Sequence, residues 1–221
     1  MANISSAFGT MILEGDWSNE DVAGLNLISQ NILFKWYYNI ELDDFEESGG
    51  KYYASFIGTG RWVFAANLKS LDRWTKEDVR ENKSLEASFV NLLKSMHSNN
   101  LEIHVTYTDE EGGCLELYEA KVVFTSDGSS LLYEEVNCTT YKYNLKNYVD
   151  VTGDVDMLDG LVISFCDKFG LSHDNGTSGD YDKVSDWITS NDKIMPHYWT
   201  FDELDEGIQQ TFIKEFGGVA A

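Results

Sequence analysis

The 221-residue sequence has few basic residues and contains no long apolar run. Sixteen Lys and Arg residues stand against 38 Asp and Glu residues, so the net charge is −22. Contacts with phosphate groups need an excess of Lys and Arg, which argues against a protein that binds nucleic acid directly or docks on an anionic membrane. No apolar segment approaches the roughly 20 residues of a membrane-spanning helix. The N-terminus lacks the basic and apolar regions of a signal peptide, so we expect none.

Cysteine and proline are also scarce. The three cysteines, Cys114, Cys138 and Cys166, are scattered, which predicts free thiols in a reducing cytoplasm rather than a disulfide framework. The sequence has one proline, and 43% of its residues are hydrophobic and 14% aromatic. This composition is typical of a folded domain with a sizeable core, and it argues against a disordered chain. We therefore expect a cytoplasmic globular protein.

The hydrophobic periodicity predicts an α+β fold. Alternation of apolar and polar residues, or short apolar runs, predicts strands over 7–14, 51–58, 61–68, 101–108, 114–125 and 131–146. Helical spacing predicts helices over 19–37, from Thr75 and from Ser84. Gly58-Thr59-Gly60 is interpreted as a hairpin turn, and residues 109–113 as another turn. The order of the first six elements predicts a ferredoxin-like βαββαβ core, here extended by a β-meander.

Near residue 150 the hydrophobic spacing changes from that of strands to that of helices. Residues 1–150 are predicted to form the α+β sheet domain, and residues 151–221 a helical C-terminal extension. The capping pair of Thr200 and Glu203 is predicted to begin the last helix. About 70 residues are marginal for an independent core. We therefore expect the helical segment to pack on the sheet as part of the same globule.

The negative charge is unevenly distributed. Residues 51–100 carry a net charge of +3, whereas residues 1–50, 101–150 and 151–221 carry −8, −7 and −10. Acidic residues at the start of the last helix are explained by the helix dipole. Two other clusters are the predicted partner-binding residues: Glu41, Asp43, Asp44, Phe45, Glu46 and Glu47 in the first, and Asp109, Glu110 and Glu111 in the second. Phe45 lies among acids, as in segments that present charge around an apolar anchor, although a solvated loop is an equal alternative.

No catalytic or metal-binding pattern is recognisable in the sequence. The four histidines have no metal-like spacing, and the segment 154–160 fails as a calcium loop because Leu158 would occupy a ligand position. Motifs of zinc peptidases, α/β-hydrolases and phosphate-binding loops are missing. We expect no enzyme, no cofactor and no metal. A hydrolase that uses paired carboxylates, for example Asp109 with Glu134 and Glu135, is a lesser alternative.

Aromatic residues are the other feature of the sequence that could indicate a binding surface. The sequence has six Trp, twelve Tyr and twelve Phe residues, of which most are expected in the core. Tyr141, Tyr143 and Tyr148 near a sheet edge, and Tyr198 with Trp199, are candidates for a surface that binds another protein.

Two stretches, Gly58 to Phe64 and the strand–turn–strand from Leu101 to Gly128, carry a resemblance. With the predicted element order, they resemble ferredoxin-like domains of unknown function encoded on plasmids and phages. The resemblance covers about residues 60–130, and the Trp-Cys-Ser-Asn-type opening of that family is absent. It implies a mobile-element origin, a host cytoplasm if the chain is phage-encoded, and a role in inhibiting defence nucleases.

Together these observations predict a non-enzymatic acidic binding protein that occupies the basic nucleic-acid channel of a host defence complex, such as a CRISPR or restriction complex. Duplex DNA carries one charge per roughly 1.7 Å, so 22 charges match about 37 Å of duplex if they gather on one face. The predicted partner is a basic nucleic-acid-binding protein. The alternative is a structural or regulatory module that binds through its sheet edge and aromatic residues, with acidity that serves solubility only.

Overall fold

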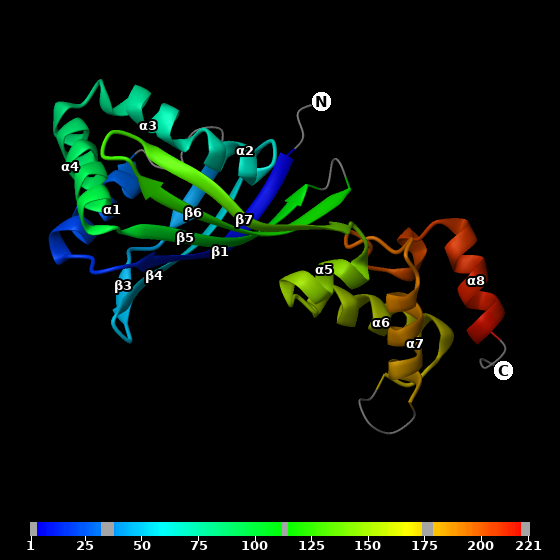
Figure 1. Ribbon diagram of the computed structural model, residues 1–221. Helices are drawn as coiled ribbons and strands as arrows, with labels where there is room; N and C mark the ends of the chain where they lie inside the picture. The colour runs from blue at the N-terminus through cyan, green and yellow to red at the C-terminus, as the bar shows by residue number, and fades with distance from the viewer. Residues whose placement is uncertain (1–3, 32–37, 112–114, 174–178, 218–221) are drawn as a thin grey trace. The chain divides into compact units, whose positions relative to one another are not determined.

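The computed structural model describes residues 4–31, 38–111, 115–173 and 179–217 (Figure 1). The chain divides into two compact units, Met1–Tyr141 and Lys142–Ala221. Each unit has a hydrophobic core of its own. None of the helices among the described residues is long and apolar enough to cross a membrane.

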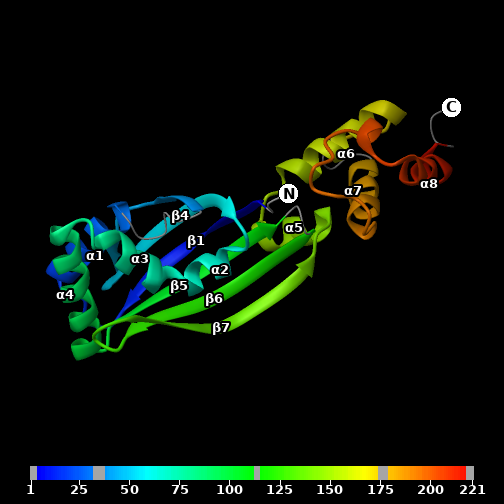
Figure 2. The same cartoon turned by 90° about the horizontal axis from the view of Figure 1, so that it is seen from above.

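The first unit is a seven-stranded sheet with helices on one face (Figures 1 and 2). Its strands are β1 (Ile4–Glu14), β2 (Tyr38–Leu42), β3 (Glu46–Ser48), β4 (Lys51–Arg61), β5 (Glu102–Glu111), β6 (Glu116–Ser126) and β7 (Leu131–Lys142). Its helices are α1 (Asn19–Asn31), α2 (Phe64–Lys69), α3 (Leu71–Val79) and α4 (Lys83–Asn99). The strand order is β2-β4-β1-β5-β6-β7, and β3 also pairs with β4. The predicted α+β class is confirmed, and the sheet is larger than a four-stranded core.

Strand β4 shows why one face of the sheet is exposed. Ala54, Phe56 and Gly58 are buried, whereas the residues between them are exposed. The inward face therefore packs under the helices, and the other face has no helix of the described first unit over it (Figure 1). The predicted hairpin at Gly58-Thr59-Gly60 was wrong, because β4 runs through these residues. Glycine is required at Gly58 since a Cβ atom there would lie 2.7 Å from Ile40 Cγ1.

Strand β5 is longer than predicted. It continues through Asp109, Glu110 and Glu111, which were expected in a turn. Asp109 pairs with Ala7 of β1 and with Tyr118 of β6, so it lies in the interior of the sheet. Residues 109–111 are therefore part of the strand, because their backbone pairs with the neighbouring strands.

The second unit is helical. It contains α5 (Leu145–Thr152), α6 (Asp156–Phe169), α7 (Asp180–Ser190), a 3₁₀ turn η1 (Phe201–Glu203) and α8 (Glu206–Phe216). Its core centres on Phe165, whose ring centroid lies 4.9 Å from that of Phe201 and 4.6 Å from that of Phe212. The segment therefore has a hydrophobic core of its own, although its length predicted that such a core would be marginal. The unit begins at Lys142 rather than at residue 151, because α5 belongs to it.

The capping box of Thr200 and Glu203 is present, but it begins η1 rather than α8. The Glu203 carboxylate accepts hydrogen bonds from the backbone N–H of Trp199 at 2.7 Å and of Thr200 at 3.2 Å. These bonds fix the backbone that carries Trp199. The pattern thus located a helical start correctly, although the helix that follows is a single turn.

Candidate functional site

The first acidic cluster lines an open hollow on the exposed face of the sheet. Four carboxylates surround it, those of Asp43, Asp44, Glu46 and Glu47. Its volume is about 750 Å³, and the rest of its lining comes from Thr10, Ser48, Tyr53, Ala54 and Ser55. The structure therefore brings together four of the predicted partner-binding residues.

The backbone of this segment is held by its neighbours. The N–H of Asp43 donates to the carbonyl oxygen of Ser55 at 3.0 Å, and the N–H of Phe45 donates to Asn26 Oδ1 at 3.2 Å. The Phe45 side chain is 6% exposed and belongs to the core of the first unit. Our interpretation of Phe45 as an anchor for a partner was therefore wrong. Its burial secures the segment and leaves the neighbouring acids facing solvent.

Little positive charge offsets the hollow. Within the described part of the chain, Asp43, Glu46 and Glu47 form no ion pair. Lys51, at the start of β4, instead pairs with Glu14 Oε1 at 2.6 Å. Like charges held close together create a negative potential that a basic group would relieve. The hollow is therefore suited to lysine or arginine side chains.

Glu41 extends this acidic surface along β2. It lies opposite Ile57 of β4, which is 59% exposed on the same face. Tyr53, 39% exposed, also belongs to this face and lines the hollow. The exposed face thus combines carboxylates with two large side chains that have apolar surface.

The second cluster differs because Asp109 is buried, with only 1% of its surface exposed. Its Oδ1 accepts hydrogen bonds from Ser5 Oγ at 2.5 Å and from the Tyr38 hydroxyl at 3.3 Å, and its Oδ2 accepts one from the Phe64 N–H at 2.6 Å. Burial raises the pKa of Asp109 to about 6, although these hydrogen bonds act in the opposite direction. Asp109 therefore holds β1, β2 and the start of α2 together, and it does not face a partner.

Glu111 is also buried, and Glu110 is half-buried. Asp109 and Glu111 are two residues apart on one strand, so they lie on the same inward face, whereas Glu110 lies on the other. The predicted exposed cluster at 109–111 is therefore wrong for Asp109 and Glu111. Their position could have been inferred from the alternation of Ile103, Val105 and Tyr107, which continues through them.

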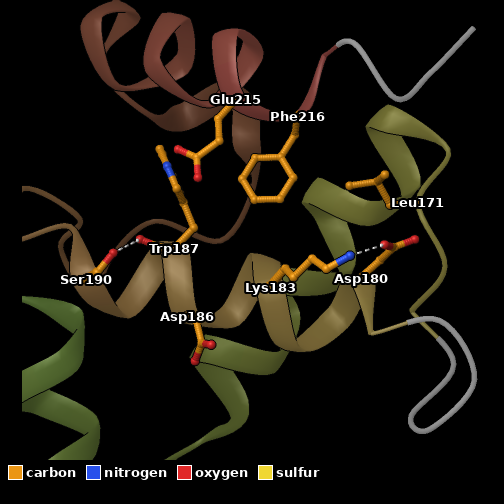
Figure 3. Close-up of a pocket in the computed structure, with 8 residues that line it drawn as sticks. All are labelled: Leu171, Asp180, Lys183, Asp186, Trp187, Ser190, Glu215 and Phe216. Carbon is orange, nitrogen blue, oxygen red and sulfur yellow. Dashed lines mark hydrogen bonds and ion pairs between the residues drawn. The ribbon is translucent and has the colours of Figure 1, made fainter.

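A second hollow, of about 610 Å³, lies in the second unit and was not predicted (Figure 3). Trp187, Phe216 and Leu171 supply apolar surface, and Glu215 and Asp186 are exposed carboxylates in its lining. Lys183 Nζ lies 3.6 Å from Asp180 Oδ1, so part of the acidity is already neutralised. In Figure 3 the Glu215 carboxylate points toward the Trp187 side chain. Aromatic surface beside a carboxylate suits a cation with an apolar stem.

The predicted aromatic candidates lie in different environments. Tyr143 is buried, and Tyr148, Tyr198 and Tyr141 are half-buried. Trp199 is 50% exposed, and a Cβ atom on Gly160 would lie 3.8 Å from its ring. Trp199 is therefore the most accessible of these five side chains.

Among the described residues, no group of three or more His, Cys, Asp or Glu side chains is placed to hold a metal ion. No protein-family model, curated protein or solved structure matches this chain.

Proposed function

We propose that this protein binds a basic nucleic-acid-binding protein through the acidic hollow lined by Asp43, Asp44, Glu46 and Glu47 and blocks access of DNA to it. The observation that carries this proposal is the gathering of four exposed carboxylates around one hollow. Such a surface competes with phosphates for lysine and arginine side chains. Because the protein contributes charge and shape, its action requires no catalysis.

The second hollow supports the same class of partner. Its aromatic floor and exposed carboxylates accept the stem and the charged end of a lysine or arginine side chain (Figure 3). Each unit thus has a place for a basic side chain. With the resemblance to mobile-element domains, this chemistry points to an inhibitor of a CRISPR or restriction complex.

We also infer a ferredoxin-like core within the first unit. The strands β2, β4, β1 and β5 are neighbours in this order, and each pairing among them is antiparallel. They alternate along the chain with α1 and with the helices α2 to α4. This is the arrangement expected of a βαββαβ unit, to which β3, β6 and β7 are additions.

The experiment compares two variants with equal changes in net charge. The hollow variant carries Asp43→Asn, Asp44→Asn, Glu46→Gln and Glu47→Gln. The control carries Glu20→Gln, Glu77→Gln, Glu81→Gln and Glu86→Gln, which are exposed elsewhere in the first unit. Immobilised proteins are exposed to bacterial lysate across a salt series, and retained nucleic-acid-binding proteins are eluted with duplex DNA.

We expect only the hollow variant to lose the retained proteins. Four exposed ion pairs of about 0.5 kcal/mol each amount to about 2 kcal/mol, or roughly a thirtyfold loss in affinity. Equal losses in both variants would show that net charge, and not the hollow, governs binding. Retention that is insensitive to salt would contradict an electrostatic mechanism altogether.

A second candidate function is an interaction module without DNA mimicry. It is favoured by the exposed side chain of Trp199, because a hydrogen bond from the Trp199 N–H to Glu203 holds the backbone there in place. Tryptophan is enriched among the residues that dominate binding energy at protein interfaces. Loss of the retained proteins on Trp199→Ala, with the hollow variant unaffected, would favour this candidate.

A further inference from the structure

The second unit has a groove between α6 and residues 199–202, apart from the hollow that Trp187 lines. Its volume is about 650 Å³. Helix α6 contributes Gly160, Ile163 and Asp167 to its lining, and Trp199 comes from the opposite segment. Trp199 is 50% exposed and Ile163 is 40% exposed. The groove therefore offers a large apolar surface to solvent.

The segment opposite α6 is held in place by its contacts with that helix. The Phe201 N–H donates to Ser164 Oγ of α6 at 3.1 Å. Lys168 of α6 forms an ion pair with Asp202, and its Nζ lies 5.0 Å from the centre of the Phe201 ring. Trp199 is thus exposed on a fixed backbone. Because the backbone is already ordered, a partner that covers Trp199 loses less of its binding free energy to conformational entropy.

Gly160 lies inside α6, where glycine is less favourable than alanine. A Cβ atom on Gly160 would lie 3.8 Å from the Trp199 ring, which is an ordinary van der Waals contact. Packing among the described residues therefore does not require glycine at this position. The missing side chain instead leaves the floor of the groove open beside Trp199. Glycine is typical of positions where another backbone or a ligand approaches closely.

Acidic residues border the apolar part of this groove along the exposed side of α6. Asp156 and Asp167 are exposed, and helical spacing places them on the same side of α6 as Ile163. They lie three helical turns apart, or about 16 Å. Within the described part of the chain Asp156 forms no ion pair, and Asp167 pairs with His173 Nε2 at 3.2 Å. An apolar centre between two acids is complementary to an apolar centre between two bases.

We propose that α6 and Trp199 bind an amphipathic helix of a partner protein, with apolar residues at the centre of its contact face and a Lys or Arg at each end. Bases three turns apart on such a helix have the same spacing as Asp156 and Asp167. Gly160 lets the two helices approach closely. A second copy of α6 is not complementary, because either orientation places acids opposite acids. The inference extends the second candidate function by naming its partner, and it does not depend on the acidic hollow.

The test measures binding of a fluorescein-labelled helical peptide to the full chain by fluorescence anisotropy. The peptide has leucine and alanine on one face and two arginines on that face, three turns apart. One control peptide has the same composition in scrambled order, and another has glutamate in place of arginine. Salt at about 150 mM screens the long-range attraction of any basic peptide to this acidic chain. The matching peptide should bind about tenfold or more tightly than either control. Equal binding of the matching and scrambled peptides would overturn the proposal.

The variant Gly160→Ala separates binding from stability. Because alanine favours a helix interior, it should raise the unfolding temperature of the second unit by about 2–8 °C. Its methyl group fills the floor of the groove, so it should weaken binding of the matching peptide about fivefold or more. Gly24→Ala is the matched control, since Gly24 has open space around it in α1, and it should leave peptide binding unchanged. If Gly160→Ala bound the peptide as tightly as the natural protein, the proposed close approach would be wrong.

Two further variants test the apolar and the charged contacts. Trp199→Ala should weaken peptide binding about tenfold or more, and unchanged binding would contradict the proposed site. Asp156→Asn with Asp167→Asn should weaken it about fivefold, as expected for two exposed ion pairs. The control Asp150→Asn with Asp182→Asn makes the same change in charge at exposed positions of α5 and α7, and an equal loss there would refute the charge pairing. These results leave the test of the acidic hollow unaffected, because that test uses other residues and proteins eluted with DNA.

Discussion

The buried carboxyl of Asp109 should make the stability of the protein depend on pH in an unusual direction. Burial raises its pKa from 3.8 to about 6 in the folded state. A raised carboxyl pKa means that the folded state favours the protonated form. The stabilisation is therefore fully present below the unfolded-state pKa and is lost as pH rises through about 6.

The size of the effect follows from the shift. A difference of about two pKa units corresponds to about 3 kcal/mol between fully protonated and fully ionised Asp109. Over the practical interval from pH 5 to pH 7, the same shift predicts a loss of about 1.3 kcal/mol in the free energy of unfolding. Since Asp109 is almost completely buried, solvent screening reduces this figure little.

The assay is urea unfolding at several pH values for the natural protein and for Asp109→Asn. Other acids also titrate, but they contribute equally to both proteins, so the difference between the two curves isolates Asp109. The substitution places an amide N–H₂ near Ser5 Oγ, Tyr38 or the Phe64 N–H, which adds a constant offset without a pH dependence. The stability of the natural protein relative to the variant should fall by about 1.3 kcal/mol from pH 5 to pH 7. If the difference in the free energy of unfolding between the two proteins stayed constant or rose with pH, the pKa of Asp109 would not be raised.

Two further predictions concern packing. Gly9→Ala should destabilise the first unit by about 2 kcal/mol or more, because a Cβ atom there would lie 2.1 Å from the Thr106 carbonyl oxygen in β5. Gly24 in α1 has open space around it, so Gly24→Ala should stabilise the first unit by about 0.5–1 kcal/mol. Thermal unfolding measures both variants, and equal effects of the two substitutions would contradict this reasoning. Phe165→Ala should destabilise the second unit by about 3–5 kcal/mol, while methyl NMR signals of the first unit keep their positions because the cores are separate. Loss of both sets of signals together would show that the units unfold as one.

The elements that the sequence predicted best are those with one regular apolar stripe. Alternation located β5, and helical spacing located α4, predicted from Ser84, because burial of one face dictates the pattern. The predicted helix start at residue 19 was correct, and Ser18 Oγ accepts a hydrogen bond there from the Asp21 N–H at 3.2 Å. These signals are local, so a single sequence carries them.

Other features depended on contacts that the sequence does not display. Gly58 was interpreted as a turn residue, but glycine is required there because Ile40 of the neighbouring strand approaches too closely for a Cβ atom. The boundary near residue 150 followed a change in composition, whereas the second unit begins at Lys142 because Leu145 belongs to its core. These features depend on tertiary contacts between elements that are distant in the sequence.

The acidic clusters show how local structure decides what a charge can do. A run of acids within a strand is divided between two faces, so Asp109 and Glu111 turned inward although the run appeared continuous. At residues 41–47 the strands are short and a loop lies between them, and Phe45 takes the buried position there. The neighbouring carboxylates are therefore left outside together. Charge density along a sequence thus predicts a binding surface only where the local structure leaves the acids exposed, as it does at Asp43, Asp44, Glu46 and Glu47, which is why this hollow carries the proposed function.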